Sequence, residues 1–300
     1  MPREFVSVAQ IEPIEKKPFL HVLPGSRAFC FGMLGCTFHC PYCQNWKISQ
    51  LPQGNTMFNA QHPITAEELV LHAEASSARV LVSTYNEPLL SAEWAVDVFR
   101  LAQSYGLLTA MVSNGYATPQ VIEYLSPWVD LFKIDLKCFN EKRYRLLGGH
   151  LSPVLAGIQE INRLGRWIEV ATVLVPGFND SEKEIRQIAG FLAGVSPDIP
   201  WHVSAFYPSH RWSDRQGGNP ERVKLAIRIG YDTGLHYVYG GSLLNLTGNF
   251  EKTYCPGCGN YLIARQGYRL IDYRLTRNGC CPFCNYPIPG RWNRTSVPME

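Results

Sequence analysis

The sequence has no long hydrophobic run and no large excess of charge of one sign. No apolar stretch approaches the length of a transmembrane helix. Residues 1–22 mix Glu and Lys with single apolar residues, so they lack the apolar core of a signal peptide. The net charge is only +3 over 300 residues, and the basic residues are too scattered to indicate a nucleic-acid surface or a polybasic membrane contact. We therefore expect a cytoplasmic protein with no membrane or nucleic-acid partner.

Cysteine, in contrast, is plentiful and unevenly distributed. Eight of the ten cysteines fall in two tight clusters, within residues 36–43 and 255–284. Disulfides are typical of small secreted chains, whereas this chain is long and shows no signal peptide. The clustering therefore indicates metal binding in a reducing compartment. The other two cysteines, Cys30 and Cys138, have no such neighbours and are expected to be free thiols.

Apolar, β-branched runs alternate with helical patterns between residues 27 and 240, which predicts a parallel sheet covered by helices. Thr65 with Glu68 and Ser181 with Glu184 form capping boxes, and Ser152-Pro153 predicts a helix start with Pro at its first position. We predict an α/β fold, a partial (β/α) barrel of about six parallel strands, with a doubly wound open sheet as the alternative. The runs are 28–33, 79–83, 108–113, 129–136, 168–175, 202–206 and 236–239.

The pattern changes near residue 245, where Cys-Pro knuckles and short strand-like pieces begin. We predict an N-terminal extension (1–24), a barrel (25–244) and a C-terminal metal module (245–300). In the last, two CxxC knuckles separated by 22 residues supply four thiolates, the pattern of a zinc ribbon or a rubredoxin-like site: Cys255, Cys258, Cys281 and Cys284. Four ligands close the site, so its expected role is structural and zinc is the favoured metal. Iron that relays electrons is the alternative, and Cys280 is a spare neighbour.

The first cluster has three cysteines and lacks a fourth. Cys36, Cys40 and Cys43 lie at spacings of four and three residues in one short loop. Such a loop can wrap a cuboidal [4Fe–4S] cluster and ligate three of its irons, which leaves one iron open. A zinc site completed by His39 or Cys30, or a Cys40-Cys43 redox pair, is the alternative.

The CxxxCxxC pattern with Tyr42 before the last cysteine resembles the signature of the radical S-adenosylmethionine (SAM) superfamily. The resemblance implies that the open iron binds the methionine end of SAM. It also implies that an electron, from a donor such as flavodoxin or ferredoxin, cleaves SAM to a 5′-deoxyadenosyl radical that abstracts hydrogen. In that superfamily the aromatic position packs near the adenine, which gives this role to Tyr42.

Polar clusters follow each predicted strand, and in a parallel barrel these strand ends open on one functional face. The zwitterionic end of SAM needs a carboxylate for its ammonium and a cation for its carboxylate. Glu87 suits the first task and Lys137 the second, while Asp135 would orient Lys137 or hold a small cation. His210 would be a proton donor, a ribose contact or a loop histidine.

The same loops resemble those of glycyl-radical-enzyme activases such as pyruvate formate-lyase activating enzymes. The resemblance adds Asn86 and Asn114 to the expected SAM site and suggests a protein glycine as substrate. The stretch 12–26, the loop ending Cys43-Gln44-Asn45-Trp46 and the C-terminal knuckles resemble the AmmeMemoRadiSam system radical enzymes. Two departures, Val112-Ser113-Asn114-Gly115 and Ala171, change the region that holds methionine and a cation in activases. The matched motifs are Tyr85-Asn86-Glu87-Pro88, Asp135-Leu136-Lys137, Val175-Pro176-Gly177 and Pro208-Ser209-His210.

These patterns predict a radical SAM enzyme whose catalytic cysteines are Cys36, Cys40 and Cys43. The substrate stays open between a protein, converted to a glycyl radical, and a small molecule. A radical methyltransferase or another peptide-modifying enzyme would share the first site and differ only in product. A non-catalytic adaptor with zinc in both cysteine clusters is the alternative from another class.

Overall fold

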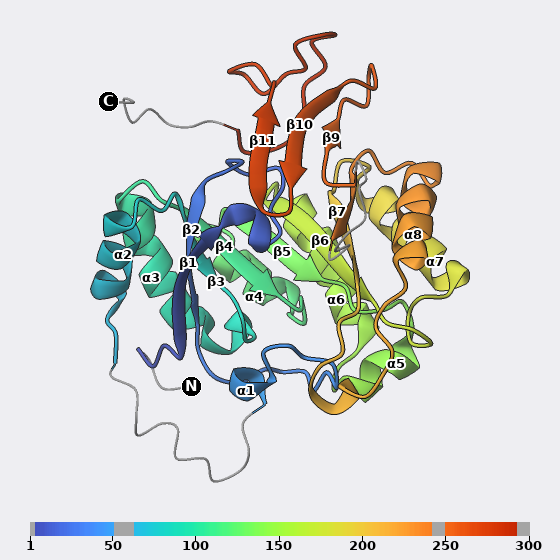
Figure 1. The fold of residues 1–300 in the computed structure, drawn as a ribbon. Coiled ribbons are helices and arrows are strands. Elements are labelled where there is room, and N and C mark those ends of the chain that lie inside the picture. The colour runs from blue at the N-terminus through green and yellow to red at the C-terminus, as the bar shows by residue number, and fades with distance from the viewer. Residues whose placement is uncertain (1–3, 51–62, 242–249, 293–300) are drawn as a thin grey trace.

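The chain folds around one large, mostly parallel sheet (Figure 1). The computed structural model describes residues 4–50, 63–241 and 250–292. Seven parallel strands run in sequence order across the sheet, so the seventh apolar run also forms a strand. They are β2 (Arg27–Gly32), β3 (Val80–Ser83), β4 (Leu108–Ser113), β5 (Leu131–Asp135), β6 (Trp167–Leu174), β7 (Trp201–Ala205) and β8 (Val238–Gly241).

The strand order decides between the two predicted topologies. Each parallel strand pairs with the next one along the chain, from β2 to β8. A doubly wound sheet reverses its order at a switch point, whereas a barrel winds in one direction. The predicted partial barrel is therefore confirmed. An eighth strand, β1 (Val8–Pro13), pairs antiparallel with β2 at the edge, with Val8 opposite Gly32.

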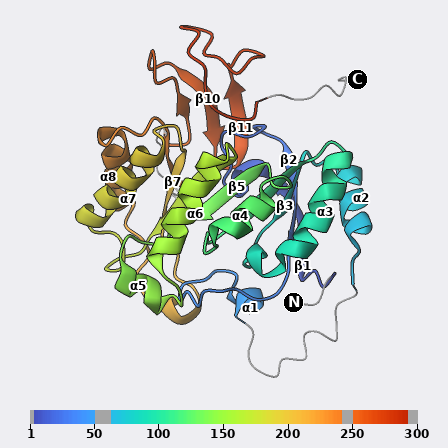
Figure 2. The ribbon, with the colours of Figure 1, turned by 180° about the vertical axis from the view of Figure 1, so that it is seen from behind.

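Helices cover the outer face of the sheet, as the view from behind shows (Figure 2). The capping residue Thr65 makes both bonds of its box with Glu68, and Ser181 accepts from the N–H of Glu184. The helix predicted from Ser152-Pro153 begins two residues earlier, at Leu151, with His150 as its N-cap. The helices are α1 (Trp46–Ser49), α2 (Ala66–Ala75), α3 (Ala92–Ser104), α4 (Pro119–Leu125), α5 (Glu141–Leu146), α6 (Leu151–Arg163), α7 (Glu182–Val195), α8 (Pro220–Asp232), η1 (Ile14–Lys16), η3 (Pro88–Ser91) and η4 (His210–Trp212). None of the described helices has the length and apolar character needed to cross a membrane.

The two faces of the sheet bury different clusters, because successive side chains point to opposite sides of a strand. Phe29 and Phe31 of β2 join the large core beneath the helices. Ala28 and Cys30 of the same strand belong to a second core, on the inner face, which is filled by side chains of the N-terminal segment: Ile14, Phe19, Val22 and Leu23. That segment therefore plugs the barrel at the end where its strands begin.

A buried carboxylate, that of Glu169 on β6, fastens this plug. It accepts hydrogen bonds from the backbone N–H groups of Leu20 and His21, each 3.0 Å long, and from the ring of His202 at 2.6 Å. At the same end of the barrel, the guanidinium of Arg265 donates a hydrogen bond to the carbonyl oxygen of Leu20. The N-terminal segment is thus joined to both the sheet and the C-terminal part of the chain.

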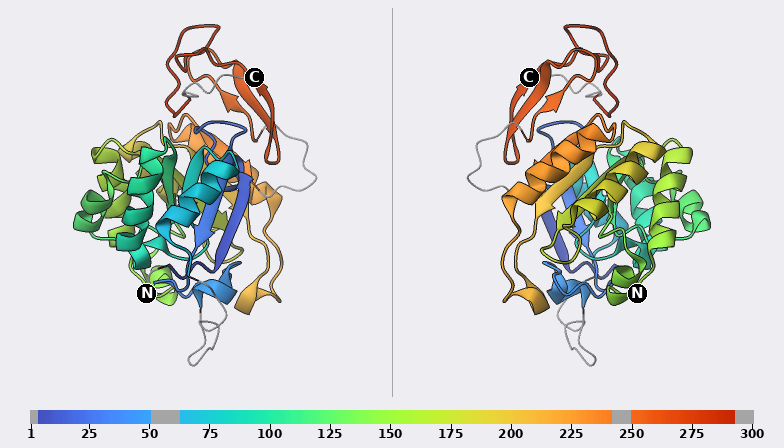
Figure 3. Two further views of the ribbon diagram at one scale, coloured as in Figure 1. Left: turned by 90° about the vertical axis from the view of Figure 1, so that its left-hand side faces the viewer. Right: turned by 90° about the vertical axis from the view of Figure 1, so that its right-hand side faces the viewer.

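The C-terminal part is a small three-stranded sheet that stands at the plugged end of the barrel (Figure 3). Its strands are β9 (Thr253–Tyr254), β10 (Tyr261–Gln266) and β11 (Arg269–Tyr273). A backbone bridge between Val22 and Arg291 joins it to the N-terminal plug. The predicted boundary at residues 244/245 lies outside the described residues, so the division into domains stays a prediction.

Candidate active site

The loop with the first three cysteines follows β2 and precedes α1, at the edge where the parallel strands end (Figure 1). Three neighbouring segments hold it. The N–H of Glu87 donates to the carbonyl of Gly35 at 3.2 Å, and the N–H of Trp212 donates to that of Pro41 at 3.1 Å. The loop is anchored from the other side by the N–H of His39, which donates to the carbonyl of Leu147 at 2.7 Å. Loops from β3, β5 and β7 therefore converge on the cysteines, as the sequence predicts.

The spacing of the three thiols distinguishes the two kinds of metal centre. A tetrahedral zinc ion, with Zn–S bonds of about 2.3 Å, brings its sulfur atoms to about 3.8 Å from one another. Among the described residues, the only group of three or more candidate ligand atoms within 4.8 Å of one another is the C-terminal quartet. At least two of the thiols of Cys36, Cys40 and Cys43 therefore lie more than 4.8 Å apart. A wider spread suits a cluster of several irons and not a single ion.

Burial keeps the thiols of Cys36 and Cys40 protonated until a cation compensates for their charge. It raises the pKa of Cys36 to about 11 and that of Cys40 to about 12, while the nearby ammonium of Lys137 acts in the opposite direction. Thiolates are the metal-binding form. Iron would supply the positive charge that the apolar surroundings do not.

Asn86 fixes the start of the loop. Its side-chain oxygen accepts from the N–H of Met33 at 3.0 Å, and its amide nitrogen donates to the carbonyl of Gly35 at 3.1 Å. The side chain of Asn114 reaches the same loop from β4 and donates to the hydroxyl of Thr37 at 2.8 Å. Both asparagines, predicted as SAM contacts, thus hold the cysteine loop in place in this structure.

Glu87 is the most unusual group of the site, because it is a buried carboxylate with no ion-pair partner among the described residues. One oxygen accepts from the hydroxyl of Ser113 at 2.7 Å and from the N–H of Leu89 at 3.1 Å; the other accepts from the N–H of Asn114 at 2.8 Å. Burial outweighs these bonds and raises the pKa of Glu87 to about 7. The second oxygen has one lone pair left for a further donor.

Asp135 lies between two ammonium groups. Its carboxylate pairs with Lys137 at 2.6 Å and, through its other oxygen, with Lys133. Burial disfavours its ionisation, but the two lysine charges outweigh burial and hold the pKa of Asp135 well below its usual range. Asp135 therefore orients Lys137, the first of its two predicted tasks. The two ammonium groups already supply the positive charge that a small cation would bring.

Tyr42 and His210 occupy aromatic surroundings at the mouth. The ring of Tyr42 is buried and stacks on Trp212 with centroids 5.4 Å apart, and its hydroxyl has no hydrogen-bond partner among the described residues. His210 stacks on Trp46 at 5.0 Å, and its Nε2 lies 3.1 Å from the side-chain oxygen of Gln50. Gln50 in turn donates to the carbonyl of Cys40 at 2.9 Å, so His210 is linked to the cysteine loop.

Several residues of the site were not singled out from the sequence. Ser113 and Thr37 bond to predicted site residues, and Lys133 shares Asp135 with Lys137. A sequence signal existed for Lys133, because alternate residues of a strand share a face and Lys133, Asp135 and Lys137 alternate. Ser113 was noted only as part of a departure from the activase motif, and Thr37 carries no comparable signal, since it acts through a loop distant in sequence.

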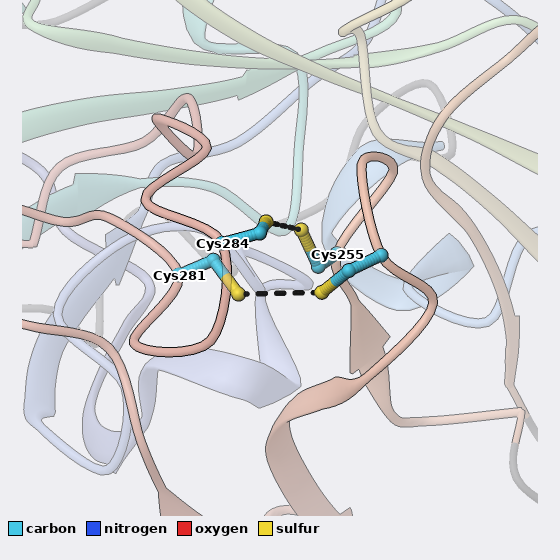
Figure 4. Close-up of side chains that lie close together, drawn as sticks. Cys255, Cys281 and Cys284 are labelled. Atoms are coloured by element: carbon cyan, nitrogen blue, oxygen red, sulfur yellow. Dashed lines mark hydrogen bonds between the residues drawn. The ribbon is translucent and has the colours of Figure 1, made fainter.

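The second cysteine cluster has the geometry of a single-ion site (Figure 4). The sulfur atoms of Cys255 and Cys284 are 3.5 Å apart, and those of Cys258 and Cys281 are 3.6 Å apart. These distances match the tetrahedral edge of about 3.8 Å expected for zinc or iron thiolates. Cys280 is not part of this quartet. The C-terminal sheet β9–β11, in the part of the chain that carries the quartet, lies at the plugged end of the barrel, and α1, which follows the first cysteine loop, lies at the other end (Figure 1).

Comparisons with known proteins agree with this geometry. Over 273 residues the chain is 33% identical to an uncharacterized protein of Methanocaldococcus jannaschii, covering 90% of this chain and 80% of that one. It is 26% identical over 180 residues to the pyruvate formate-lyase-activating enzyme of Clostridium pasteurianum, covering 57% and 71% of the two chains. A radical SAM methyltransferase from Sphaerobacter thermophilus shares the fold, with a TM-score of 0.55 at 17% identity over 72% of this chain and 66% of that chain.

The family assignment rests on the segment that builds the site. Residues 32–189 match the profile of the Radical SAM superfamily. They include the three-cysteine loop, both asparagines, Glu87 and the segment from Asp135 to Lys137. The chain is an enzyme that belongs to the radical SAM superfamily.

Proposed function

We propose that the enzyme binds a [4Fe–4S] cluster through Cys36, Cys40 and Cys43 and uses it to cleave SAM. The observation that carries this proposal is the three-cysteine loop, which lies within the segment that matches the Radical SAM superfamily. When bound, the cluster supplies one electron that breaks a C–S bond of SAM to give methionine and a 5′-deoxyadenosyl radical, which takes a hydrogen atom from the substrate. A closed zinc site in this loop would need thiols closer together.

The side chains around the loop suit the two charges of the methionine end. Glu87 is a buried carboxylate that lacks a cation, and the ammonium of SAM would supply one. The positive charge of Lys137 acts to lower the pKa of the thiols of Cys36 and Cys40. The same ammonium group would bind the carboxylate of SAM. Asp135 holds Lys137 in place. Tyr42, with its unpartnered hydroxyl, would lie against the adenine.

We propose that a glycine residue of a polypeptide gives the hydrogen atom to the 5′-deoxyadenosyl radical. Flavodoxin or ferredoxin would be the source of electrons. The names of two relatives support the substrate class. One is the pyruvate formate-lyase-activating enzyme of Clostridium pasteurianum, and the other is a putative glycyl-radical enzyme activating enzyme of M. jannaschii that is 28% identical over 165 residues. An electron spin resonance signal on a co-expressed polypeptide would support this substrate. A modified small molecule without such a signal would exclude it.

At the C-terminal quartet we propose a structural zinc ion. Four thiolates at tetrahedral spacing leave no open position for a substrate. Cysteines clustered for metal binding suit a reducing compartment such as the cytoplasm, which we propose as the location. Metal analysis separates zinc from iron at this site.

The experiment for the main proposal is anaerobic cluster reconstitution, followed by reduction with dithionite in the presence of SAM and chromatography for 5′-deoxyadenosine. Alanine substitution of Cys36, Cys40 or Cys43 should abolish the product. Cys30→Ala and His39→Ala are the matched controls, since they remove the two residues that could complete a zinc site, and both should retain the product. Absence of 5′-deoxyadenosine from the reconstituted wild type would refute the proposal.

A further inference from the structure

The one-turn helix α1 folds back on the cysteine loop that precedes it. The carbonyl of Ile48, in this helix, accepts a hydrogen bond of 2.8 Å from the N–H of Gly35 at the start of the loop. The side-chain amide of Gln50, the residue after the helix, donates to the carbonyl of Cys40 at 2.9 Å. The residue between these two, Ser49, is therefore held against the loop.

The hydroxyl of Ser49 contacts one of the three cysteine sulfurs. Ser49 is only 5% exposed, and its Oγ lies 3.2 Å from the Sγ of Cys43. A cysteine that binds a metal is a thiolate, which has no hydrogen to give. In the proposed cluster-bound enzyme the hydroxyl must therefore donate and the sulfur accept. Hydrogen bonds to an ionised acceptor are roughly twice as strong as those between neutral groups, and the low dielectric of a buried position strengthens them further.

A second cysteine of the loop also has a donor at its sulfur, but of another kind. The sulfur of Cys36 accepts a hydrogen bond of 3.3 Å from the backbone N–H of Phe38. Side-chain substitution leaves a backbone donor in place, whereas the donor at Cys43 belongs to a side chain. The bond from Ser49 to Cys43 is therefore one that the amino-acid sequence can add or remove.

A donor at a ligating sulfur affects the two oxidation states of an iron–sulfur cluster unequally. Reduction adds one electron, and part of the added negative charge falls on the thiolate ligands. A hydrogen bond to a ligand sulfur therefore stabilises the reduced state more than the oxidised state. Hydrogen bonds to the sulfurs are among the features that set the reduction potential of such clusters. Removal of the donor should lower the potential, so that the cluster becomes harder to reduce.

We propose that Ser49 raises the reduction potential of the cluster by donating a hydrogen bond to the thiolate of Cys43. The inference rests on the proposed function, in which Cys43 is a cluster ligand. During reduction one electron passes from the external donor to the cluster, and the proton of Ser49 stays on its own oxygen. Ser49 acts through Cys43, so it is a positioning residue and not a catalytic one. Its effect is to let a weaker reductant supply the electron.

The test is a potentiometric titration of the reconstituted full-length protein, with dithionite as reductant and without SAM, followed by electron spin resonance of the reduced cluster. Ser49→Ala should lower the equilibrium constant for reduction about tenfold, which is a shift of about 59 mV to lower potential for a one-electron couple. Ser49→Thr and Ser49→Val have the same shape and differ in the hydroxyl. The threonine variant should therefore keep the wild-type potential, and the valine variant should match the alanine variant.

Ser76→Ala is the control for loss of a serine hydroxyl elsewhere in the fold. The hydroxyl of Ser76 donates to the carbonyl of Ala73 at the end of α2. The carbonyl of Ser76 accepts from Arg27, at the start of β2, whereas the cysteine loop follows the end of that strand. This variant should therefore keep the wild-type potential.

Equal potentials in the wild type and in Ser49→Ala would overturn the proposal. Equal potentials in the threonine and valine variants would also overturn it, and this pair decides if the alanine variant loses its iron. Loss of iron from every Ser49 variant would show a structural role and overturn it as well. Iron analysis of the same samples identifies a failure of the proposed function. A wild type without a cluster refutes both proposals, whereas a full cluster whose potential is the same in all variants refutes only the role of Ser49.

Discussion

The backbone N–H of Asn114 donates a 2.8 Å hydrogen bond to the carboxylate of Glu87, 27 residues earlier in the chain. This bond joins the loop after β4 to the loop after β3 and aims a buried carboxylate into the mouth of the barrel. Burial leaves that carboxylate with a pKa of about 7. The group is therefore half-protonated near neutral pH until a cation binds beside it.

SAM affinity should rise with pH around this value. Below its pKa, Glu87 is protonated and cannot pair with the ammonium of SAM, so the apparent Kd scales inversely with the ionised fraction. Between pH 6 and pH 8 that fraction rises about tenfold for a pKa near 7, and the Kd should fall by the same factor. Equilibrium binding of SAM to the reconstituted enzyme gives this Kd at each pH. Glu87→Gln should bind weakly with a flat profile, and a wild-type profile equally flat would contradict the pairing.

Asn86→Ala should loosen the cysteine loop. The substitution leaves the N–H of Met33 without a partner, which costs about 1–3 kcal/mol for an unpaired buried group, and it removes one of the two hydrogen bonds that the carbonyl of Gly35 accepts. We expect a lower Tm and a faster loss of iron to a chelator. The cluster absorbance measures the rate of iron loss. Asn140→Ala is the control: it removes an exposed N-cap of α5 and should lower the Tm without accelerating iron loss. Equal rates of iron loss in the two variants would show that Asn86 has no special role at the loop.

Gly149→Ala should disturb the same loop by steric pressure. A Cβ at Gly149 would lie 2.2 Å from Cε1 of Phe38, between two cysteine ligands in the sequence. Phe38 cannot swing away easily, because it is buried and packs on the rings of Tyr116 and Tyr144 at 5.3 and 5.9 Å. Overpacking of this kind costs about 1–3 kcal/mol. The measurements are the Tm and the iron content after reconstitution; Gly194→Ala, with nothing within 4 Å of its Cβ, should match the wild type in iron content and have an equal or higher Tm.

Glu169→Gln should destabilise the barrel floor in a pH-dependent way. Burial acts against ionisation of Glu169, but His202, His21 and the N–H of Leu20 outweigh it and lower its pKa. A lowered pKa gives stability that is present above the ordinary value of 4.5 and is lost as the pH falls through the folded-state value. At pH 7 we expect urea denaturation to show that the variant's free energy of unfolding is about 1–3 kcal/mol lower than that of the wild type. This difference between the two proteins should shrink below pH 4.5. Glu182→Gln, at an exposed pair with Arg186, should change stability by less than about 0.5 kcal/mol at either pH.

Much of the barrel and of the site could be predicted because the governing patterns are local. Strands buried on both faces read as continuous apolar runs, and their ends bring loops such as Asp135-Leu136-Lys137 to one edge. β1 was not predicted as a strand, because it lies at the sheet edge and four of its six residues are exposed, so it has no apolar run. The helix start predicted from Ser152-Pro153 was wrong by two residues, since His150 takes the cap position without a side-chain bond. The floor around Glu169 joins residues about 150 apart, and no sequence period encodes such contacts.

Adjacent cysteines offer a sharp test of the second metal site. Cys281 belongs to the quartet and is buried, whereas Cys280 next to it does not. Cys281→Ser should therefore lose the bound metal, about one ion per chain for a closed four-thiolate site, and make the segment after residue 250 sensitive to protease. Cys280→Ser should keep both metal and resistance. Iron in the first cluster should persist in both variants, because the sheet β9–β11, in the part of the chain that carries the quartet, lies at the opposite end of the barrel (Figure 1). Retention of the metal in Cys281→Ser, or its loss in Cys280→Ser, would contradict the four-ligand assignment, and loss of the first cluster's iron would mean that the two ends of the barrel are coupled.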